Sequence, residues 1–360
     1  MKQPISSHSF DGSTYRLPAE WEKHEATFLA WPHNSETWPG LLAGVQKTYL
    51  KIIQALVPGE KVYLLAKDCE AADEINQVLQ KAKLHSPNLK VLIIPNDDAW
   101  VRDSGPIFIL RRDEGFPRRV AHDFTFNSWG GKYGPWDNDD VIPQQASKML
   151  NFPIVTHDFV LEGGSLDTDG EGTLLTTEKC LLNPNRNPSL NRNEIEKRLC
   201  NWFGIQKIIW LHDGVEGDDT DGHVDDISRF IAPGVVVTVV EPNKQDANHA
   251  PLAENLLRLK GATNAKGQPL KVLEMPMPPR ADGPHHRNPA SHANFYIGNS
   301  AVLVPVFESP TDSVALDLLR PYFPDRSVIG IDCRDLVSGL GAIHCITQQM
   351  PAIPANSYPL

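Results

Sequence analysis

The sequence predicts an α/β fold in which five strand–helix–strand units form one domain of residues 1–360 with five-fold pseudosymmetry. Apolar strand-like runs alternate with helix-like stretches along the chain, and the pattern recurs roughly every fifty to sixty residues, which is typical of repeat architectures. A strand, a helix and a second strand in this order usually form a parallel pair with a right-handed crossover. Five similar units would close around an axis with their helices outside. The alternative is an open α/β sheet whose repetition is accidental.

A lead-in segment, residues 1–39, precedes the units. It is rich in aromatic residues and ends in Trp31-Pro-His-Asn-Ser-Glu-Thr-Trp-Pro39. Aromatic side chains serve equally in packed loops and in the walls of binding sites, so both interpretations stay open.

The five units occupy residues 40–360, and each pairs two apolar runs across a helical stretch. In order, the strand, helix and strand are Val62–Ala66, Ala71–Gln80 and Val91–Pro95; Val120–Phe126, Pro143–Leu150 and Ile154–His157; Thr173–Leu182, Glu194–Cys200 and Lys207–Leu211; Val235–Val240, Leu252–Leu259 and Val272–Met275; Ala301–Val306, Ser313–Leu319 and Val328–Ile331.

A loop rich in polar residues follows the second strand of each unit. Parallel α/β sheets usually bind ligands at the carboxyl ends of their strands, so we expect these loops to share one site. They contain Asn96–Gly105, Phe159–Ser165, Asp213–Asp226, Arg280–His286 and the segment around Cys345.

The composition narrows the class of protein. The 360 residues are 41% hydrophobic and 22% charged, as in a soluble globular protein, and the formal net charge is -11. This charge argues against a nucleic-acid partner and would help to attract a cationic ligand.

The sequence gives no sign of export or of membrane insertion. The N-terminal residues Met1–His8 lack an apolar signal core, and no apolar run is long enough to cross a bilayer. The five cysteines are scattered and odd in number, which fits neither a disulfide framework nor a C-x-x-C zinc site. We therefore expect a cytoplasmic protein with reduced thiols and no membrane partner.

The segment Gly339-Leu-Gly-Ala-Ile-His-Cys345 presents a candidate nucleophile. Glycine permits a bend that a side chain would block, so two glycines just before Cys345 would let the thiol be exposed to a substrate. The alternative is a cysteine that is buried as a small hydrophobic residue.

The third loop combines several carboxylates with His223. An EF-hand alignment on Gly222 places Gly217 first and Ser228 last, where calcium ligands are required, so that motif is excluded. A divalent-metal site of another geometry and a solvated acidic turn remain alternatives. In His223-Val-Asp225, strand alternation would point both side chains into one cavity, with the imidazole as general acid and base.

Asp103 in the first loop and Glu162 in the second are weak signals when taken alone, because turns and helix caps often contain acids. With His223, Asp225 and Cys345 they form a set that suits a guanidinium substrate. Carboxylates hold the planar cation in paired geometry, a thiolate attacks its carbon, and an imidazole protonates the departing ammonia.

Four motifs, taken together, resemble those of the agmatine deiminases and the bacterial peptidylarginine deiminases. They are Trp100-Val-Arg-Asp-Ser-Gly-Pro106, Glu162-Gly-Gly164, Asp218-Asp-Thr-Asp-Gly-His-Val-Asp225 and Ile343-His-Cys-Ile-Thr-Gln-Gln349. These enzymes belong to the guanidine-modifying superfamily, which has the pentein fold. The resemblance runs from Trp31 to Pro351 and keeps the family's order of motifs.

The resemblance implies a five-bladed α/β propeller and an enzyme that hydrolyses a small cationic guanidino substrate, most simply agmatine. Cys345 would be the nucleophile and His223 the general acid and then base. Glu162 would orient His223, and Asp103 and Asp225 would hold the guanidinium nitrogens. Trp100 would line the substrate channel, and no metal or organic cofactor would be required.

The far end of the substrate is less defined by the motifs. Asp219 suits a terminal ammonium and would repel a free carboxylate. Many agmatine deiminases have Gly-Gly-Gly-Asn where this chain has Gly339-Leu-Gly-Ala342, and Asn where it has Asp226. A deiminase of peptidyl-arginine or of another guanidino compound, and a non-catalytic pentein that only binds a partner, are the competing hypotheses. A homodimer is expected by analogy alone.

Overall fold

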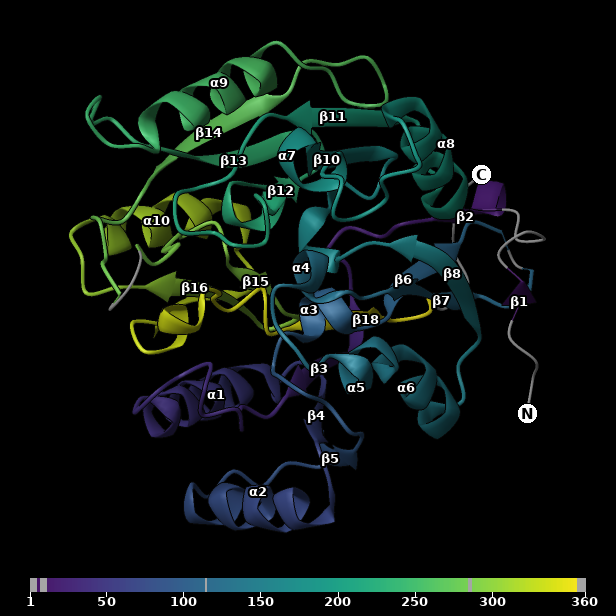
Figure 1. Ribbon diagram of the computed structural model, residues 1–360, viewed down its shortest axis with the longest axis vertical. Helices are drawn as coiled ribbons and strands as arrows, with labels where there is room; N and C mark the ends of the chain where they lie inside the picture. Colours follow the sequence, from purple (N-terminus) through teal and green to yellow (C-terminus); the bar gives the residue numbers. More distant parts are fainter. Residues whose placement is uncertain (1–4, 7–11, 114, 284–286, 355–360) are drawn as a thin grey trace.

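The computed structural model describes residues 5–6, 12–113, 115–283 and 287–354. It confirms the predicted α/β class: the strands form five mixed sheets with helices packed against them (Figure 1). No helix in these ranges is both long and apolar enough to cross a membrane.

Each predicted strand–helix–strand unit is present as a parallel pair. The units are β4 (Lys61–Ala66), α2 (Cys69–Lys81) and β5 (Leu89–Ile93); β7 (Arg119–Thr125), α6 (Ile142–Leu150) and β8 (Ile154–Val160); β10 (Thr173–Thr177), α8 (Arg192–Phe203) and β11 (Lys207–Leu211); β13 (Val235–Val240), α9 (His249–Lys260) and β14 (Lys271–Pro276); β16 (Ala301–Val306), α10 (Thr311–Leu319) and β17 (Ser327–Asp332).

Four of these pairs gain an antiparallel strand on one edge, which makes the sheets mixed. β6 (Ile107–Arg111) pairs with β7, β9 (Asp167–Thr168) with β10, β12 (Ser228–Ala232) with β13, and β15 (Tyr296–Ile297) with β16. Two short strands, β1 (Ile5–Ser6) and β2 (Tyr15–Arg16), extend the edges of the second unit's sheet.

The remaining sheet joins the two ends of the chain. β3 (His24–Ala30) runs parallel to β4 across α1 (Leu42–Leu56), and β18 (Gln348–Pro351) runs antiparallel to β3. Residues 1–39 therefore supply a sheet strand and are more than a lead-in. Most of β3 is buried, so its mostly apolar run is typical of an internal strand.

The third unit differs from its prediction in one respect. The apolar run predicted as a strand to Leu182 leaves the strand at Thr177 and continues as the short helix α7 (Glu178–Leu181). The hydroxyl of Thr177 accepts a hydrogen bond from the backbone N–H of Cys180 at 3.2 Å, which caps this helix. The cap places Cys180 in a helical turn.

Local signals fix the ends of the longer helices. α8 begins with a capping box, in which Asn191 and Glu194 bond each other's backbone N–H, and ends at Gly204 with φ 64°. The side chain of Asp68 caps α2 by accepting a hydrogen bond from the backbone N–H of Ala71 at 2.7 Å. Figure 1 shows α1, α2, α6, α8, α9 and α10 around the outside, with the short α3 (Val101–Ser104) near the middle.

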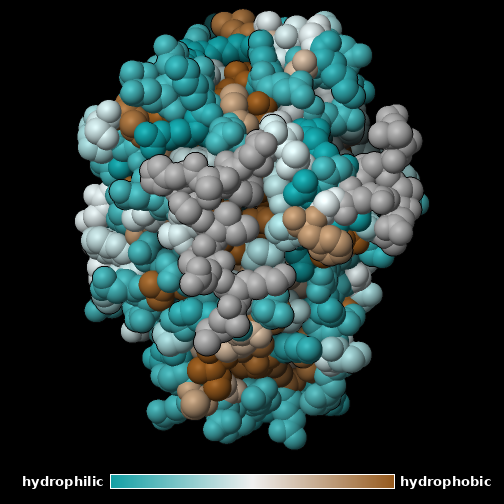
Figure 2. All heavy atoms as spheres, turned by 90° about the vertical axis from the view of Figure 1, so that its right-hand side faces the viewer, coloured by the Kyte–Doolittle hydropathy of each residue, from teal (hydrophilic) through white to brown (hydrophobic). Residues whose placement is uncertain are grey.

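Apolar side chains gather on the surface at the lower end of the molecule (Figure 2). Figure 1 places α2 and the edge strand β5 at that end. Ile93 of β5 has 42% of its surface exposed.

Candidate active site

Three of the predicted loops meet around the backbone of Gly164. α3, the 3-10 turn η3 (Gly163–Ser165) and the 3-10 turn η4 (Val224–Asp226) come from separate units, and η3 contacts both of the others. A Cβ atom at Gly164 would lie 2.6 Å from Nδ1 of His223, 2.9 Å from Oδ1 of Asp103 and 3.0 Å from Oδ2 of Asp225. Three predicted site residues therefore converge on a point that only glycine leaves open.

Cys345 lies beside the same carboxylates. Its Sγ is 3.9 Å from Oδ2 of Asp225, and the thiol is almost completely buried. Burial and the charges of Asp225, Asp226 and Asp103 hold the pKa of the Cys345 thiol well above its usual value. The site therefore disfavours a thiolate until a cation offsets these acids.

Asn294 holds the Cys345 thiol in place, and sequence reasoning missed it. Its Nδ2 donates to Sγ of Cys345 at 3.1 Å and to Oδ1 of Asp226 at 2.9 Å. Its Oδ1 accepts from the backbone N–H of His344 at 2.9 Å. One buried amide thus fixes both the thiol and the backbone beside it. Asn294 lies near β15 in an unremarkable stretch of sequence, so no local pattern marks it.

Behind Asp225 lies a buried imidazole between two carboxylates. Nδ1 of His344 is 2.6 Å from Oδ2 of Asp225, and its Nε2 is 2.8 Å from Oε2 of Glu20. Burial and the charges of Arg102 and Arg229 lower the pKa of His344, against the opposing effects of Glu20 and Asp225. Burial opposes ionisation of Asp225, but the hydrogen bond with His344 and the positive charges nearby lower its pKa. The other oxygen, Oδ1, has no hydrogen-bond partner among the described residues.

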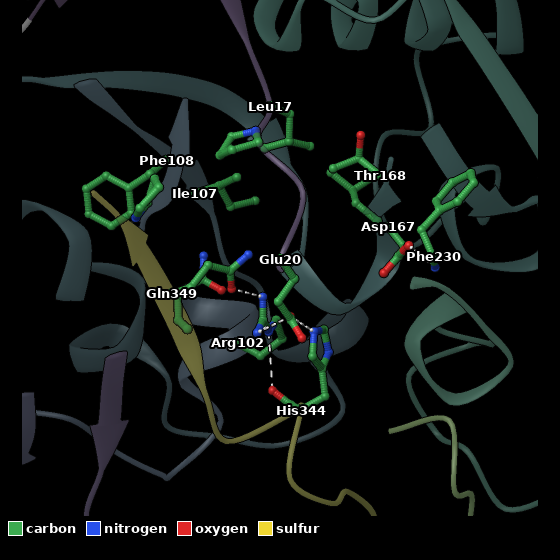
Figure 3. A pocket seen from close by; sticks show the side chains of 15 residues that line it. Leu17, Glu20, Arg102, Ile107, Phe108, Asp167, Thr168, Phe230, His344 and Gln349 are labelled. Atoms are coloured by element: carbon green, nitrogen blue, oxygen red, sulfur yellow. Dashed lines mark hydrogen bonds and ion pairs between the residues drawn. The ribbon is translucent and has the colours of Figure 1, made fainter. Parts of the chain in front are cut away.

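The chain of contacts from Glu20 through His344 to Asp225 is called the relay below. A small cavity of about 50 Å³ adjoins it on the side of Glu20. Figure 3 shows Arg102 and His344 meeting the Glu20 carboxylate at its floor. Nη2 of Arg102 lies 3.3 Å from Glu20, and Nη2 of Arg229 lies 2.9 Å from it. These contacts fix the relay, and through it the orientation of Asp225.

Asp103 is held by two donors. Nε1 of Trp129 donates to Oδ2 at 3.0 Å, and the backbone N–H of Gly164 donates to Oδ1 at 2.9 Å. Burial raises the pKa of Asp103 to about 6, against the opposing effect of His223. Trp129 was not among the predicted residues; it lies in α4 (Ser128–Gly131), where its φ of 55° is unusual for a non-glycine residue.

His223 and Glu162 lie together with Cys180. One oxygen of Glu162, the Cys180 sulfur and a ring nitrogen of His223 all lie within 4.8 Å of one another, and all three residues are buried. Burial opposes the charged form of His223, yet Asp103, Cys180 and Glu162 raise its pKa well above the usual value. Within the described residues the Glu162 carboxylate makes no hydrogen bond to this ring; it accepts from Nε of Arg186 at 2.6 Å.

The reason given for pairing His223 with Asp225 was wrong, although both side chains do face Gly164. His223 is the N-cap of the 3-10 turn η4, which contains Asp225, and these residues do not form a strand. The backbone N–H of His223 donates to Oδ2 of Asp218 at 3.0 Å, and such side-chain bonds to the backbone favour turns. A carboxylate of the acidic loop therefore stabilises the loop's own backbone.

Trp100 packs against Trp38, with the rings tilted by 39° and their centroids 5.3 Å apart, and it touches the loop before Cys345. A Cβ atom at Gly341 would lie 2.4 Å from the Trp100 ring. The loop has no room for side chains at its two glycines, as expected, although its positive φ, 73°, belongs to Leu340. Gly341 permits the close approach of Trp100 to Cys345.

Asp219 lies farther out and is half-buried. Its carboxylate accepts a hydrogen bond from the Tyr133 hydroxyl, and the Tyr133 ring lies 6.0 Å from that of Trp129. Asp219 is therefore linked to Asp103 through two aromatic side chains. Burial raises its pKa, against the opposing hydrogen bond from Tyr133.

The fourth predicted loop is only partly described, since residues 284–286 lie outside the described residues. Its described residues Arg280 and Asp282 form an ion pair at 2.7 Å. From this unit, Asn294 is the residue that reaches Cys345.

Comparison with known proteins agrees with these observations. The family profile described as Porphyromonas-type peptidyl-arginine deiminase matches residues 16–351. The chain belongs to this family. Its membership confirms the resemblance inferred from the four motifs.

Several agmatine deiminases are similar over nearly the whole chain. The agmatine deiminase of Pseudomonas aeruginosa (strain LESB58) is 38% identical, over 98% of this chain and 99% of that protein. The structure of the Enterococcus faecalis agmatine deiminase superposes with a TM-score of 0.88 at 32% identity, covering 97% of this chain and 99% of that one. The C. jejuni agmatine deiminase with substrate bound gives a TM-score of 0.83 at 31% identity, covering 93% and 96%.

Proposed function

We propose that this peptidyl-arginine deiminase family member is an agmatine deiminase, which converts agmatine and water to N-carbamoylputrescine and ammonia. Its relatives with that name support the proposal over almost the full chain. The observation that carries it is the buried thiol of Cys345 among Asp225, Asp226 and Asp103, whose charges raise the thiol pKa. A planar cation bound in such a site would offset the charges of these carboxylates and favour the thiolate.

In the first half of the reaction, Asp103 and Asp225 hold the guanidinium nitrogens in paired geometry. Oδ1 of Asp225 is available for this role because His344 takes the other oxygen. The positive charge of the substrate favours the Cys345 thiolate, so the thiol loses its proton to solvent and the sulfur attacks the guanidinium carbon. The tetrahedral adduct then breaks its C–N bond, and His223 protonates the departing ammonia.

The second half hydrolyses the amidino-cysteine that remains. His223, now neutral, takes a proton from water, and the hydroxide adds to the amidino carbon. The C–S bond then breaks, which leaves a ureido group on the product and frees Cys345. Asp103, Cys180 and Glu162 keep the pKa of His223 high, as the step that releases ammonia requires.

The rest of the substrate is an alkyl chain that ends in an ammonium. Trp100 lines the channel in this proposal, and Asp219 binds the ammonium. Asp219 is joined to the inner site by Tyr133 and Trp129, which suits a substrate that extends outward from Asp103.

We also propose that the chain is a single domain and that the five mixed sheets are the blades of a propeller. Pairing of β18 with β3 would close the ring. A cytoplasmic homodimer completes the proposal, by analogy with the commonest assembly.

The test is ammonia release from agmatine, free arginine and a blocked arginine peptide. The proposal expects agmatine to have the highest kcat/KM and Cys345→Ala to have no activity with it. Cys69→Ala, which removes an exposed thiol, is the matched control and should keep the wild-type rate.

A preference for the arginine peptide would change the proposed substrate from agmatine to peptidyl-arginine, the substrate for which the family is described. Activity that survives Cys345→Ala would contradict the covalent route. Absence of activity with every guanidino compound would favour the hypothesis of a non-catalytic binding protein.

A further inference from the structure

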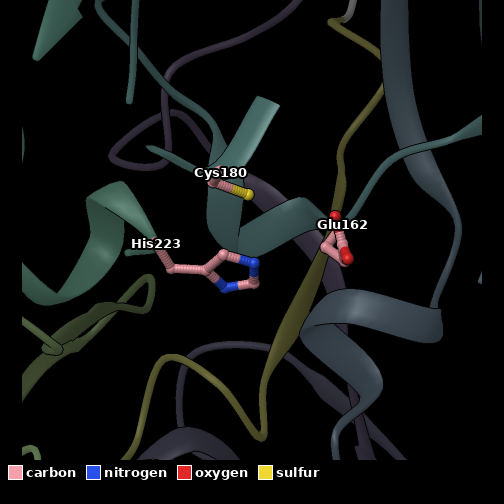
Figure 4. Close-up of side chains that lie close together, drawn as sticks. All are labelled: Glu162, Cys180 and His223. Atoms are coloured by element: carbon pink, nitrogen blue, oxygen red, sulfur yellow. The ribbon is translucent and has the colours of Figure 1, made fainter. Parts of the chain in front are cut away.

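The side chains of Glu162, Cys180 and His223 form a compact cluster of three different ligand types. Figure 4 shows the His223 ring with one nitrogen on the side that faces the Cys180 sulfur and the Glu162 carboxylate. The carboxylate oxygen, the thiol sulfur and the ring nitrogen lie within 4.8 Å of one another, and the three residues are buried.

The ligand atoms of this cluster are largely unused by the protein. In the described part of the chain, Oε2 of Glu162 has no hydrogen-bond partner, and no residue outside the cluster is within hydrogen-bond distance of a His223 ring nitrogen. The ring interacts with the Cys180 thiol inside the cluster, and its Nδ1 lies 3.7 Å from Oδ1 of Asp103. Buried polar atoms normally have such partners. Arg186 bonds the other oxygen, Oε1, at 2.6 Å, which holds the carboxylate in place. The cap formed by Thr177 holds Cys180.

We propose that Glu162, Cys180 and His223 bind a zinc ion as an inhibitory ligand, with the fourth position open to water. Zinc takes sulfur, nitrogen and oxygen ligands in tetrahedral geometry, at about 2.0 to 2.3 Å. Its ligand atoms are then roughly 3.3 to 3.8 Å apart, so the cluster needs to contract by at most about 1.5 Å. On binding, the Cys180 thiol and the protonated ring of His223 each lose a proton to solvent, and the thiolate and the freed ring nitrogen bond the metal.

A second group of potential ligands, Asp225, Asp226 and Cys345, is less suited to zinc. Its ligand atoms also lie within 4.8 Å of one another, but it contains no imidazole. His344 already bonds Asp225, and Asn294 already bonds both Asp226 and the Cys345 sulfur. Zinc would have to break these contacts.

The bound ion would occupy His223 and Glu162, so it would stop proton transfer by His223. Binding of a guanidinium in the site would release the ion. This consequence rests on the proposed deiminase function. The binding itself does not, because it can be measured without turnover.

Cobalt(II) tests the binding, since a thiolate ligand gives it an intense charge-transfer absorption. The full chain carrying Cys345→Ala is titrated with cobalt and then with zinc. We expect the thiolate band to appear and zinc to abolish it. The band should be lost in Cys345→Ala/Cys180→Ser and in Cys345→Ala/Cys180→Ala, and kept in Cys345→Ala/Cys200→Ser.

Absence of a thiolate band from Cys345→Ala, or a band that persists without Cys180, would overturn the proposal. Two replacements of Cys180 are used so that a folding defect in one, checked by its thermal midpoint, does not decide the result.

Inhibition gives the second readout. Zinc should inhibit agmatine hydrolysis, and Cys180→Ser should raise the half-inhibitory concentration by about ten-fold or more relative to its own uninhibited rate. Equal zinc sensitivity of the two proteins would count against the site. If no deiminase activity exists, the cobalt result still decides the binding.

Discussion

At the scale of single residues, the site depends on a glycine and an amide that touch several reacting groups at once. Gly164 lies against His223, Asp103 and Asp225, and Asn294 joins the Cys345 thiol to Asp226. Gly164 is part of the motif Glu162-Gly-Gly164, whereas no sequence motif marks Asn294. Its role exists only because the fold brings residues 294 and 345 together.

Replacing Gly164 by alanine should lower kcat/KM for agmatine about 100-fold, because the new methyl group must displace His223 or one of the two aspartates by about 1 Å. The measurement is steady-state kinetics alongside a thermal unfolding midpoint. Gly261→Ala, whose new Cβ atom meets nothing closer than 3.5 Å, is the control. Wild-type kinetics in Gly164→Ala would show that this packing is unimportant.

Replacing Asn294 by alanine should lower kcat about 10- to 100-fold, because a hydrogen bond to a charged group is lost. The thiol pKa should rise further above its already raised value. The pH dependence of Cys345 alkylation by iodoacetamide measures this shift, with the exposed Asn243→Ala as control. An unchanged alkylation profile would mean that Asn294 does not stabilise the thiolate.

At the scale of elements, the strand–helix–strand order was predictable because it depends on runs of apolar residues. The parallel pairs β4–β5, β7–β8 and β13–β14 lie close to their predicted ranges. Short elements were not predictable: α7 depends on one hydroxyl cap at Thr177, and the turn at His223 depends on the position of Asp218. Single side-chain contacts override the apolar pattern there.

A short helix also fixes the loop that leads to Trp100 and Asp103. In α5 (Asp137–Asp140), the buried carboxyl group of Asp139 accepts hydrogen bonds from the backbone N–H groups of Asp97, at 2.8 Å, and Asp98, at 3.2 Å. Burial raises the pKa of Asp139 to about 8.

This raised pKa predicts a pH-dependent stability. The folded state keeps a proton that the unfolded chain releases, so the free energy of unfolding falls as the pH rises from about 4 to about 8. Asp139→Asn has no carboxyl group here to ionise, so its free energy of unfolding lacks this decrease. The free energy of unfolding of Asp139→Asn minus that of wild type should therefore increase by about 2 kcal/mol between pH 6 and pH 8. Urea unfolding at the two pH values measures it.

The exposed Asp137→Asn of the same helix is the control for loss of charge. A constant difference between Asp139→Asn and wild type across this pH range would show that Asp139 is ionised throughout.

At the scale of the whole molecule, the site requires both ends of the chain. β18 pairs with β3, and the relay from Glu20 through His344 to Asp225 joins three distant segments. The motifs predicted Cys345, His223 and Asp225 because their chemistry is visible in their residue types. Glu20, Arg186 and Trp129 were not predictable, since each acts by supporting another side chain across the fold.

The central claim is that Cys345 forms a covalent bond to the guanidino carbon. Wild-type protein is mixed with agmatine, quenched with acid within the first turnovers, digested and analysed by mass spectrometry. The account predicts that the peptide containing Cys345 gains the mass of agmatine less one ammonia, and that this adduct decays as N-carbamoylputrescine accumulates. Turnover with an unmodified Cys345 at every quench time, or an adduct on another residue, would contradict it.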